Sequence, residues 1–218
     1  RLMQKDQRLV SHELHFYGIG ESELEYKLHD LMAKSKNPTI APYAGTGEVK
    51  LRVTASLPEG EDAEALLQPA IKKILAAAGD YCYGIDVPDL QTAAVQALRQ
   101  KGLTVASAES CTGGLVAARL TEVPGASAVF GCGIVSYNNT VKAEVLGVDP
   151  AIIEQHTAVS AETAAAMAEA VRKKSGADIG IGVTGNAGPS ASEGQPVGLV
   201  FVAVASEKYS HVSRLFID

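Results

Sequence analysis

The sequence predicts an α/β protein, with a small α+β domain followed by a three-layer α/β/α domain. Two observations carry this prediction. The residue pattern changes at Asp86-Val87-Pro88, so we expect one domain at residues 1–85 and a second at 86–218. After this linker, helical segments alternate with strands that are apolar throughout, and such strands are typically buried on both faces.

The first domain is predicted to begin with a strand that ends at the Gly18–Gly20 turn. A helix should then start at Ser22, where Ser22 and Glu25 have the spacing of a capping box. Asn37-Pro38 should end this helix.

A second strand is expected at 48–56, because apolar and polar residues alternate there. A second amphipathic helix is expected at 61–78, with a kink or an early boundary at Pro69. The segment 81–84 would close the domain, so the predicted order is strand, helix, strand, helix.

The second domain is predicted to contain helices at 90–100, 115–120, 141–146 and 160–174, and strands at 104–107, 129–137, 179–183, 197–205 and 212–217. Ligands of such folds bind outside the carboxyl ends of the strands. Three polar or glycine-rich segments follow strands here, namely "AESCTGG", "SYNNTVK" and "TGNAGPSASEG".

The composition argues against nucleic-acid binding and against a membrane-spanning protein. The 218 residues carry a formal charge of −6. Residues 1–85 have 10 Lys and Arg against 12 Asp and Glu, and the rest have 9 against 13, so nucleic acid is not the expected partner. No apolar run approaches the roughly 20 residues of a membrane span. The three cysteines are unpatterned, which favours a reducing cytoplasm.

The segment "AESCTGG" (108–114) places Ser110 between a strand and a helix. The free amides of a helix start suit an anion or an oxyanion there. Gly113 and Gly114 would let a ligand approach the backbone closely. Equally, Ser110 or Thr112 could simply cap the helix.

A base for this serine is not obvious, because the second domain contains only His156 and His211. Lys142 is the stronger candidate, since burial and nearby dipoles can lower a lysine pKa toward neutrality. Tyr137 could relay a proton, and Asn139 could hold an amide or orient the lysine. The alternative is that Lys142 faces solvent on a surface helix.

Cys111 is the rival nucleophile, because a thiol at a helix start has a lowered pKa. It would need a base, and only His156 is on offer. We therefore favour Ser110 and interpret Cys111 as a small buried apolar residue.

The segment 184–198 is rich in Gly, Pro and Ser, so it should be a loop. Thr184 and Gly185 directly follow a predicted buried strand, and their amides could hold a phosphate, although an ordinary surface loop would look the same. Neither nucleotide-binding fingerprint is present, and no group of side chains has metal-ligand spacing.

Taken together and in this order, the segments resemble the competence/damage-inducible protein CinA family. The matching stretches are "AESCTGG", "VPGASAVFGCGIVSYNNTVKAEVLGV", "TAVSAETAAAMAEAV", "GVTG-AGP" and "PVGLVFVAV". They resemble its nicotinamide mononucleotide deamidase domain. Residues 1–85, with "FYGIGESELEYKLHDLM" and "GEVKLRVTAS", resemble its KH-like middle domain.

The resemblance implies a serine amidohydrolase with a Ser-Lys dyad, in which the serine is Ser110 and the lysine Lys142. It places Tyr137 as a third catalytic residue, and it implies no cofactor, no metal and a dimer or larger assembly. The substrate would be nicotinamide mononucleotide. The expected substrate-binding residues are Glu109, Cys111, Thr112, Gly113, Gly114, Asn139, Thr184 and Gly185.

Two features depart from the family pattern. Asn186 stands where isoleucine is usual, and Ser190-Ala191-Ser192 replaces a common glycine-rich turn. The chain begins at Arg1 and ends during a strand. We therefore expect a piece of a longer protein, without the family's molybdopterin-binding-like first domain and without its last helix.

Two other functions stay open. The chain could bind a pyridine nucleotide, or serve in assembly, without turning the nucleotide over. Nucleic-acid binding through the KH-like domain is disfavoured by charge and by the absence of a G-x-x-G loop between its helices.

Overall fold

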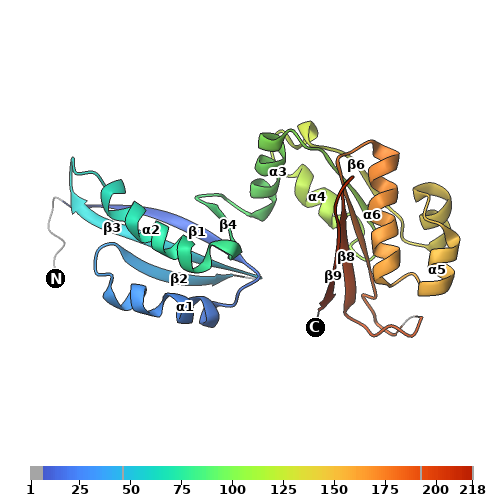
Figure 1. Ribbon diagram of the computed structural model, residues 1–218, viewed down its shortest axis with the longest axis horizontal. Coiled ribbons are helices and arrows are strands. Elements are labelled where there is room, and N and C mark those ends of the chain that lie inside the picture. The colour runs from blue at the N-terminus through green and yellow to red at the C-terminus, as the bar shows by residue number, and fades with distance from the viewer. Residues whose placement is uncertain (1–6, 46, 192, 218) are drawn as a thin grey trace. The chain divides into compact units, whose positions relative to one another are not determined.

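The computed structural model describes residues 7–45, 47–191 and 193–217 of the chain (Figure 1). The chain divides into two compact units, Arg1–Ala93 and Ala94–Asp218. One sheet has four strands and the other has five. Each unit therefore builds its own hydrophobic core.

The first unit contains an antiparallel sheet in the order β2-β3-β1-β4. The strands are β1 (Gln7–Tyr17), β2 (Thr39–Gly45), β3 (Glu48–Pro58) and β4 (Cys82–Ile85). β3 alternates as predicted, because every second side chain from Val49 to Leu57 is buried. The buried side chains form the core with the helices.

Strands β2 and β4 are absent from the predicted order of this unit. Both lie at an edge of the sheet. β2 carries Pro42, which an edge strand tolerates because one side of it needs no ladder hydrogen bonds. β4 has only four residues, too few to show a period.

The helices of the first unit are α1 (Glu21–Lys34), α2 (Glu64–Ala78) and the short 3-10 helix η1 (Gly79–Tyr81). The predicted capping box is wrong, because Gly20 is the N-cap and Ser22 already lies within the first turn. α2 runs through Pro69, so no boundary occurs there. Leu24 and Leu28 of α1 enter the core beside α2.

The second unit contains the sheet β6-β5-β7-β8-β9. Its strands are β5 (Val105–Glu109), β6 (Phe130–Val135), β7 (Ile179–Gly185), β8 (Leu199–Ala205) and β9 (Ser210–Phe216). β5 pairs in parallel with β6 and β7, while β8 and β9 are antiparallel. All five predicted strands are present.

The remaining helices are α3 (Leu90–Lys101), α4 (Leu115–Thr121), η2 (Ala126–Ala128), the π-helix η3 (Val141–Leu146), α5 (Pro150–His156) and α6 (Ala161–Ser175). α5 was not predicted, although Asp149 caps it and proline stands at its first position. In the described residues, no helix is long and apolar enough to cross a membrane.

The helices cover both faces of this sheet (Figure 1). Met167 and Val171 of α6 pack against Ala106 and Ala108 of β5. On the other face, α3 and α4 pack with Val105 of the same strand. The predicted three-layer α/β/α architecture is confirmed.

Strand β7 lies unusually close to α6. A Cβ on Gly180 would be 2.0 Å from the carbonyl oxygen of Ala168, and one on Gly182 would be 2.2 Å from that of Ala164. Only glycine permits this approach. The close packing holds β7, and with it the segment that follows β7, in a defined position.

Candidate functional site

The candidate site lies at the carboxyl ends of β5 and β7, where the two strands run in parallel. A cavity of about 320 Å³ is found there. It is lined by Ser110, Cys111, Tyr137, Asn139, Lys142, Ala158, Val159, Thr184, Gly185, Asn186, Ala187, Gly188, Ser190 and Glu193. This is the position in which α/β folds bind ligands.

Ser110 directly follows β5 and is nearly buried, with 7% of its surface exposed. Its amide donates to the carbonyl of Val183, and its own carbonyl accepts from the amide of Gly113. The backbone of the serine is thus fixed by β7 on one side and by a turn on the other. Its hydroxyl lies on the cavity.

Lys142 lies on η3 and is almost fully buried, with 1% exposed. Its Nζ lies 3.2 Å from the Ser110 Oγ and 3.0 Å from the carbonyl oxygen of Ser136, and 3.5 Å from that of Tyr137. A neutral amine has two hydrogens and one lone pair. If the hydrogens face the two carbonyls, the lone pair faces the serine hydroxyl.

Burial lowers the pKa of Lys142 below its ordinary value of 10.5. The negative charge of Glu193 opposes this and raises the pKa, but burial outweighs it. The prediction of a solvent-facing lysine is therefore excluded, and the amine has the environment of a base.

Glu109 is also buried, with 1% exposed, but its carboxylate points into the structure around α4. It accepts hydrogen bonds from the hydroxyls of Ser107 and Thr112 and from the amides of Val116 and Ala117. Burial raises the pKa of Glu109, but the four hydrogen bonds outweigh it and hold the pKa below its usual value.

These contacts correct the predicted role of the helix start. α4 begins at Leu115, as predicted. Its first free amides bind the Glu109 carboxylate, so they are not available to an oxyanion. Among the described residues, the amides of Cys111 and Thr112 donate to no backbone carbonyl, and both lie against the Cys111 sulfur beside Ser110.

Several predicted binding residues lie outside the cavity lining. These are Glu109, Thr112, Gly113 and Gly114. Gly113 and Gly114 have positive φ angles of 61° and 101°, and they form the turn that leads into α4. They shape the chain behind the site, where left-handed backbone makes glycine the favoured residue.

Cys111 lines the cavity beside Ser110. Burial raises the pKa of its thiol above the ordinary value. The thiolate, which is the nucleophilic form, is therefore disfavoured. The predicted base for this thiol, His156, lies outside the cavity lining and is 3.8 Å from Glu162.

Tyr137 and Asn139 line the cavity on the side of η3. The Tyr137 side chain is largely exposed, and the contact that it makes with Lys142 comes from its backbone carbonyl. Asn138, which the sequence did not single out, orders this turn. Its side chain accepts from the amide of Val141, and its carbonyl accepts from that of Lys142.

Thr184 and Gly185 end β7 at the cavity. The Thr184 hydroxyl donates to the carbonyl of Ala158, 2.7 Å away, so its hydrogen is not free for a phosphate. A Cβ on Gly185 would be 2.8 Å from the carbonyl oxygen of Leu199 and 3.0 Å from the Cys111 Sγ. Glycine is needed there because the backbones meet so closely.

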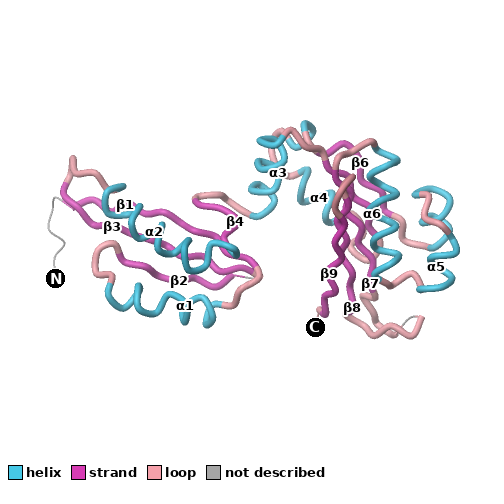
Figure 2. Tube along the Cα trace, in the orientation of Figure 1, coloured by secondary structure: helices cyan, strands magenta, loops and turns pink. Residues whose placement is uncertain are grey.

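The segment between β7 and β8 is a loop, as predicted (Figure 2). Asn186, the departure from the family pattern, is 7% exposed and holds this loop together. Its side-chain amide donates to the carbonyls of Ser190 and Gln195, and its oxygen accepts from the amide of Gly188. Ser192, part of the other departure, lies outside the described residues.

Glu193 belongs to the cavity and was missed by the sequence reasoning. Its carboxylate accepts from the amide of Ala158 at 2.8 Å. A single acidic residue in a loop carries no spacing signal, so nothing in the local sequence identifies it.

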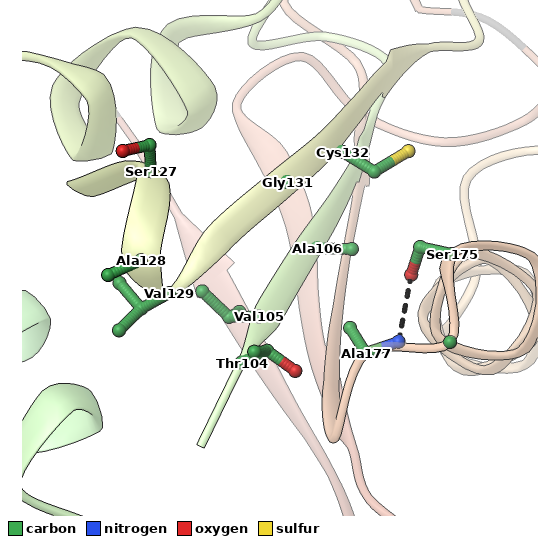
Figure 3. A pocket seen from close by; sticks show the side chains of 11 residues that line it. Thr104, Val105, Ala106, Ser127, Ala128, Val129, Gly131, Cys132, Ser175 and Ala177 are labelled. Carbon is green, nitrogen blue, oxygen red and sulfur yellow. Dashed lines mark hydrogen bonds between the residues drawn. The ribbon is translucent and has the colours of Figure 1, made fainter. Parts of the chain in front are cut away.

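A second cavity, of about 280 Å³, lies at the opposite ends of β5 and β6 (Figure 3). Small side chains line it, including Ala106, Cys132 and Ser175. The Ser175 hydroxyl accepts from the amide of Ala177 (Figure 3). The lining contains no charged side chain. It offers no base or nucleophile comparable to Lys142 and Ser110.

Comparison with known protein families matches both units. A family description of the CinA C-terminal domain matches residues 88–218. A second, the damage-inducible protein CinA KH domain, matches residues 11–84.

Similar proteins carry names from the same family. A putative competence-damage inducible protein of Bacillus pumilus is 48% identical over 206 residues, which cover 94% of this chain and 50% of the relative. The chain spans about half the length of the curated relatives it matches.

Two solved structures are similar in fold. The competence damage-inducible protein A (ComA) of Klebsiella pneumoniae is 34% identical, with a TM-score of 0.57, and the match covers 59% of this chain and 81% of that one. The competence/damage inducible protein CihA of Agrobacterium tumefaciens is 39% identical, with a TM-score of 0.54, over 57% and 76% of the two chains.

Proposed function

Since the chain belongs to the CinA family, we propose that its second unit hydrolyses the carboxamide of nicotinamide mononucleotide, giving nicotinic acid mononucleotide and ammonia. The observation that supports this most is the buried Lys142 amine, 3.2 Å from the Ser110 hydroxyl. A nucleophile within reach of a base is the requirement for acyl transfer. None of the described residues that line the cavity is a histidine.

In the first step, neutral Lys142 takes the proton of the Ser110 hydroxyl. The serine oxygen attacks the carbonyl carbon of the amide and forms a tetrahedral oxyanion. The carbonyls of Ser136 and Tyr137 hold the resulting ammonium through its other hydrogens.

We assign the oxyanion to the backbone amides of Cys111 and Thr112. Among the described residues they donate to no backbone carbonyl, and they follow the nucleophile directly. Each well-placed donor of this kind contributes about 3–4 kcal/mol to the transition state.

The tetrahedral intermediate then collapses, the C–N bond breaks, and the leaving nitrogen takes a proton and departs as ammonia. The proton comes from Lys142, and we assign to Tyr137, a residue of the cavity lining, the role of helping to deliver it to the leaving nitrogen. Water, deprotonated by Lys142, hydrolyses the serine ester. This regenerates Ser110 and releases the carboxylate.

The phosphate is assigned to the loop that follows Gly185. Thr184 contributes there by fixing the loop rather than through its hydroxyl, which already donates to Ala158. Cys111 and Asn139 complete the predicted walls around the ring.

The test is ammonia release from nicotinamide mononucleotide, nicotinamide riboside and free nicotinamide, together with intact-protein mass spectrometry. We expect turnover of the mononucleotide and, after rapid quenching, a mass increase equal to the acyl group. Ser110→Ala should lack both. Calorimetric binding without ammonia release would contradict the proposal and favour a binding module.

A further inference from the structure

Glu193 and Lys142 line the same cavity at the carboxyl ends of β5 and β7. Glu193 is the one carboxylate, and Lys142 the one cation, among the described lining residues. The first is exposed on the loop between β7 and β8, whereas the second is buried on η3. An exposed carboxylate at the mouth of a cavity can meet a ligand before any other charged group does.

The Glu193 carboxylate is held in place rather than free to turn away. It accepts from the amide of Ala158 at 2.8 Å, and the carbonyl of Ala158 accepts from the Thr184 hydroxyl at 2.7 Å. The loop is thereby tied to the end of β7 through the backbone of Ala158. The negative charge reaches the interior of the site, because it raises the pKa of Lys142 against the effect of burial.

The proposed substrate has a matching charge. The ring nitrogen of nicotinamide mononucleotide bonds to ribose, so the ring is a pyridinium cation. Free nicotinamide has a neutral ring under the same conditions. A carboxylate at this cavity therefore meets a positively charged ring in nicotinamide mononucleotide and an uncharged ring in free nicotinamide.

We propose that the Glu193 carboxylate pairs with the positively charged ring and selects pyridine amides substituted at the ring nitrogen over neutral ones. This inference rests on the proposed function for the identity of the ligand. The pairing also neutralises the charge of Glu193, which otherwise opposes the deprotonation of Lys142. The substrate thus favours the reactive form of the base.

The test compares the binding of two nucleotides that differ in ring charge. Nicotinamide mononucleotide has a cationic ring, and its 1,4-dihydro form has a neutral ring with the same ribose, phosphate and carboxamide. Binding is measured by calorimetry in the Ser110→Ala background, where no turnover occurs. We expect the cationic form to bind about fivefold more tightly, as for a partly exposed charge pair.

In Glu193→Gln the two dissociation constants should become nearly equal. The glutamine oxygen can still accept from Ala158, so the loop contact is kept. Glu154→Gln is the matched control, because Glu154 is an exposed carboxylate on α5 outside the cavity lining, and its variant should retain the preference.

An unchanged preference in Glu193→Gln, or an equal loss for both nucleotides, overturns the inference, and so does failure to bind either one. Ammonia release by the unmodified protein is measured separately. A charge preference without turnover overturns the proposed reaction alone. Turnover without a preference overturns the role of Glu193 alone.

Discussion

The end of β5 and the helix η3, which follows β6, each bury an ionisable side chain to the same extent. Glu109 and Lys142 are both 1% exposed. Glu109 accepts four hydrogen bonds, two of them from the amides of α4, and its pKa stays below the usual value. Lys142 faces a hydroxyl and two carbonyls, and its pKa is lowered.

The difference teaches that partners, not burial alone, decide the protonation state. A buried carboxylate with enough donors stays ionised and serves the structure. A buried amine without a paired carboxylate has a lowered pKa, which favours its neutral form. Glu109 at the end of β5 therefore anchors α4, while Lys142 on η3 supplies chemistry to the proposed reaction.

The largest expected effect comes from Lys142→Met, which keeps much of the side-chain volume and removes the amine. Ammonia release should fall by about a thousandfold, because the serine loses its base. The free energy of unfolding should rise by about 1–2 kcal/mol, because a poorly paired buried ionisable group is removed. Steady-state ammonia assays and urea unfolding check both. Near-normal turnover would contradict the assignment.

Glu109→Gln should act in the opposite way on stability. The amide nitrogen of glutamine would face N–H donors, so the variant should lose about 2–4 kcal/mol of unfolding free energy. Thermal and urea unfolding measure this loss. Turnover per folded molecule should fall less than in Lys142→Met. Equal stability of the variant and the parent would show that the carboxylate does not anchor α4.

The pH dependence of stability should also separate the two residues. At a pH above about 4.5, the pKa of Glu109 in the unfolded chain, the lowered pKa in the folded state stabilises the fold. This contribution is lost as the pH falls through the pKa of the folded state. The lowered pKa of Lys142 instead reflects a destabilising contribution, because the folded state disfavours the charged amine. The unfolded chain binds the extra proton, so stability rises with pH between the lowered folded value and 10.5.

Urea unfolding at a series of pH values measures both contributions. The deficit of Glu109→Gln should shrink as the pH falls below about 4, and the advantage of Lys142→Met should shrink as the pH rises toward 10. A Glu109→Gln deficit that shrank with rising pH, or a Lys142→Met advantage that shrank with falling pH, would contradict the comparison.

The smallest expected effect distinguishes two serines, Ser107 on β5 and Ser136 after β6, that are both fully buried. The Ser107 hydroxyl donates to Glu109, whereas that of Ser136 has no hydrogen-bond partner among the described residues. Ser107→Ala should cost about 1 kcal/mol of unfolding free energy, and Ser136→Ala should change it by less than about 0.5 kcal/mol. A larger loss in Ser136→Ala would reveal a partner for its hydroxyl.

Much of the fold follows from local pattern. The apolar strands of the second unit and the alternation in β3 predicted their elements. The edge strand β2 was missed, because Pro42 masks its period. The capping box at Ser22 was wrong, because a spacing match does not reveal where the helix begins.

The site was predicted in part. Ser110 and Lys142 were singled out, and the structure places them in contact. The adjacent Glu109 belongs to the support of α4 instead, and Glu193 was not foreseen. Neighbours in sequence point to different surroundings once the chain turns, so spacing alone does not separate a lining residue from a supporting one.

The sequence by itself determined the two domains, the buried strands and the polar turns that follow those strands. These depend on side-chain pattern and turn chemistry, which act between near neighbours. Only the tertiary structure decided that Lys142 lies among carbonyl groups beside Ser110, while Glu109 lies among donors. Most of these partners are near in sequence, but the way the chain turns decides which of them face each side chain, and Ser110 reaches Lys142 from 32 residues away. Burial and these partners together set the pKa of each buried group.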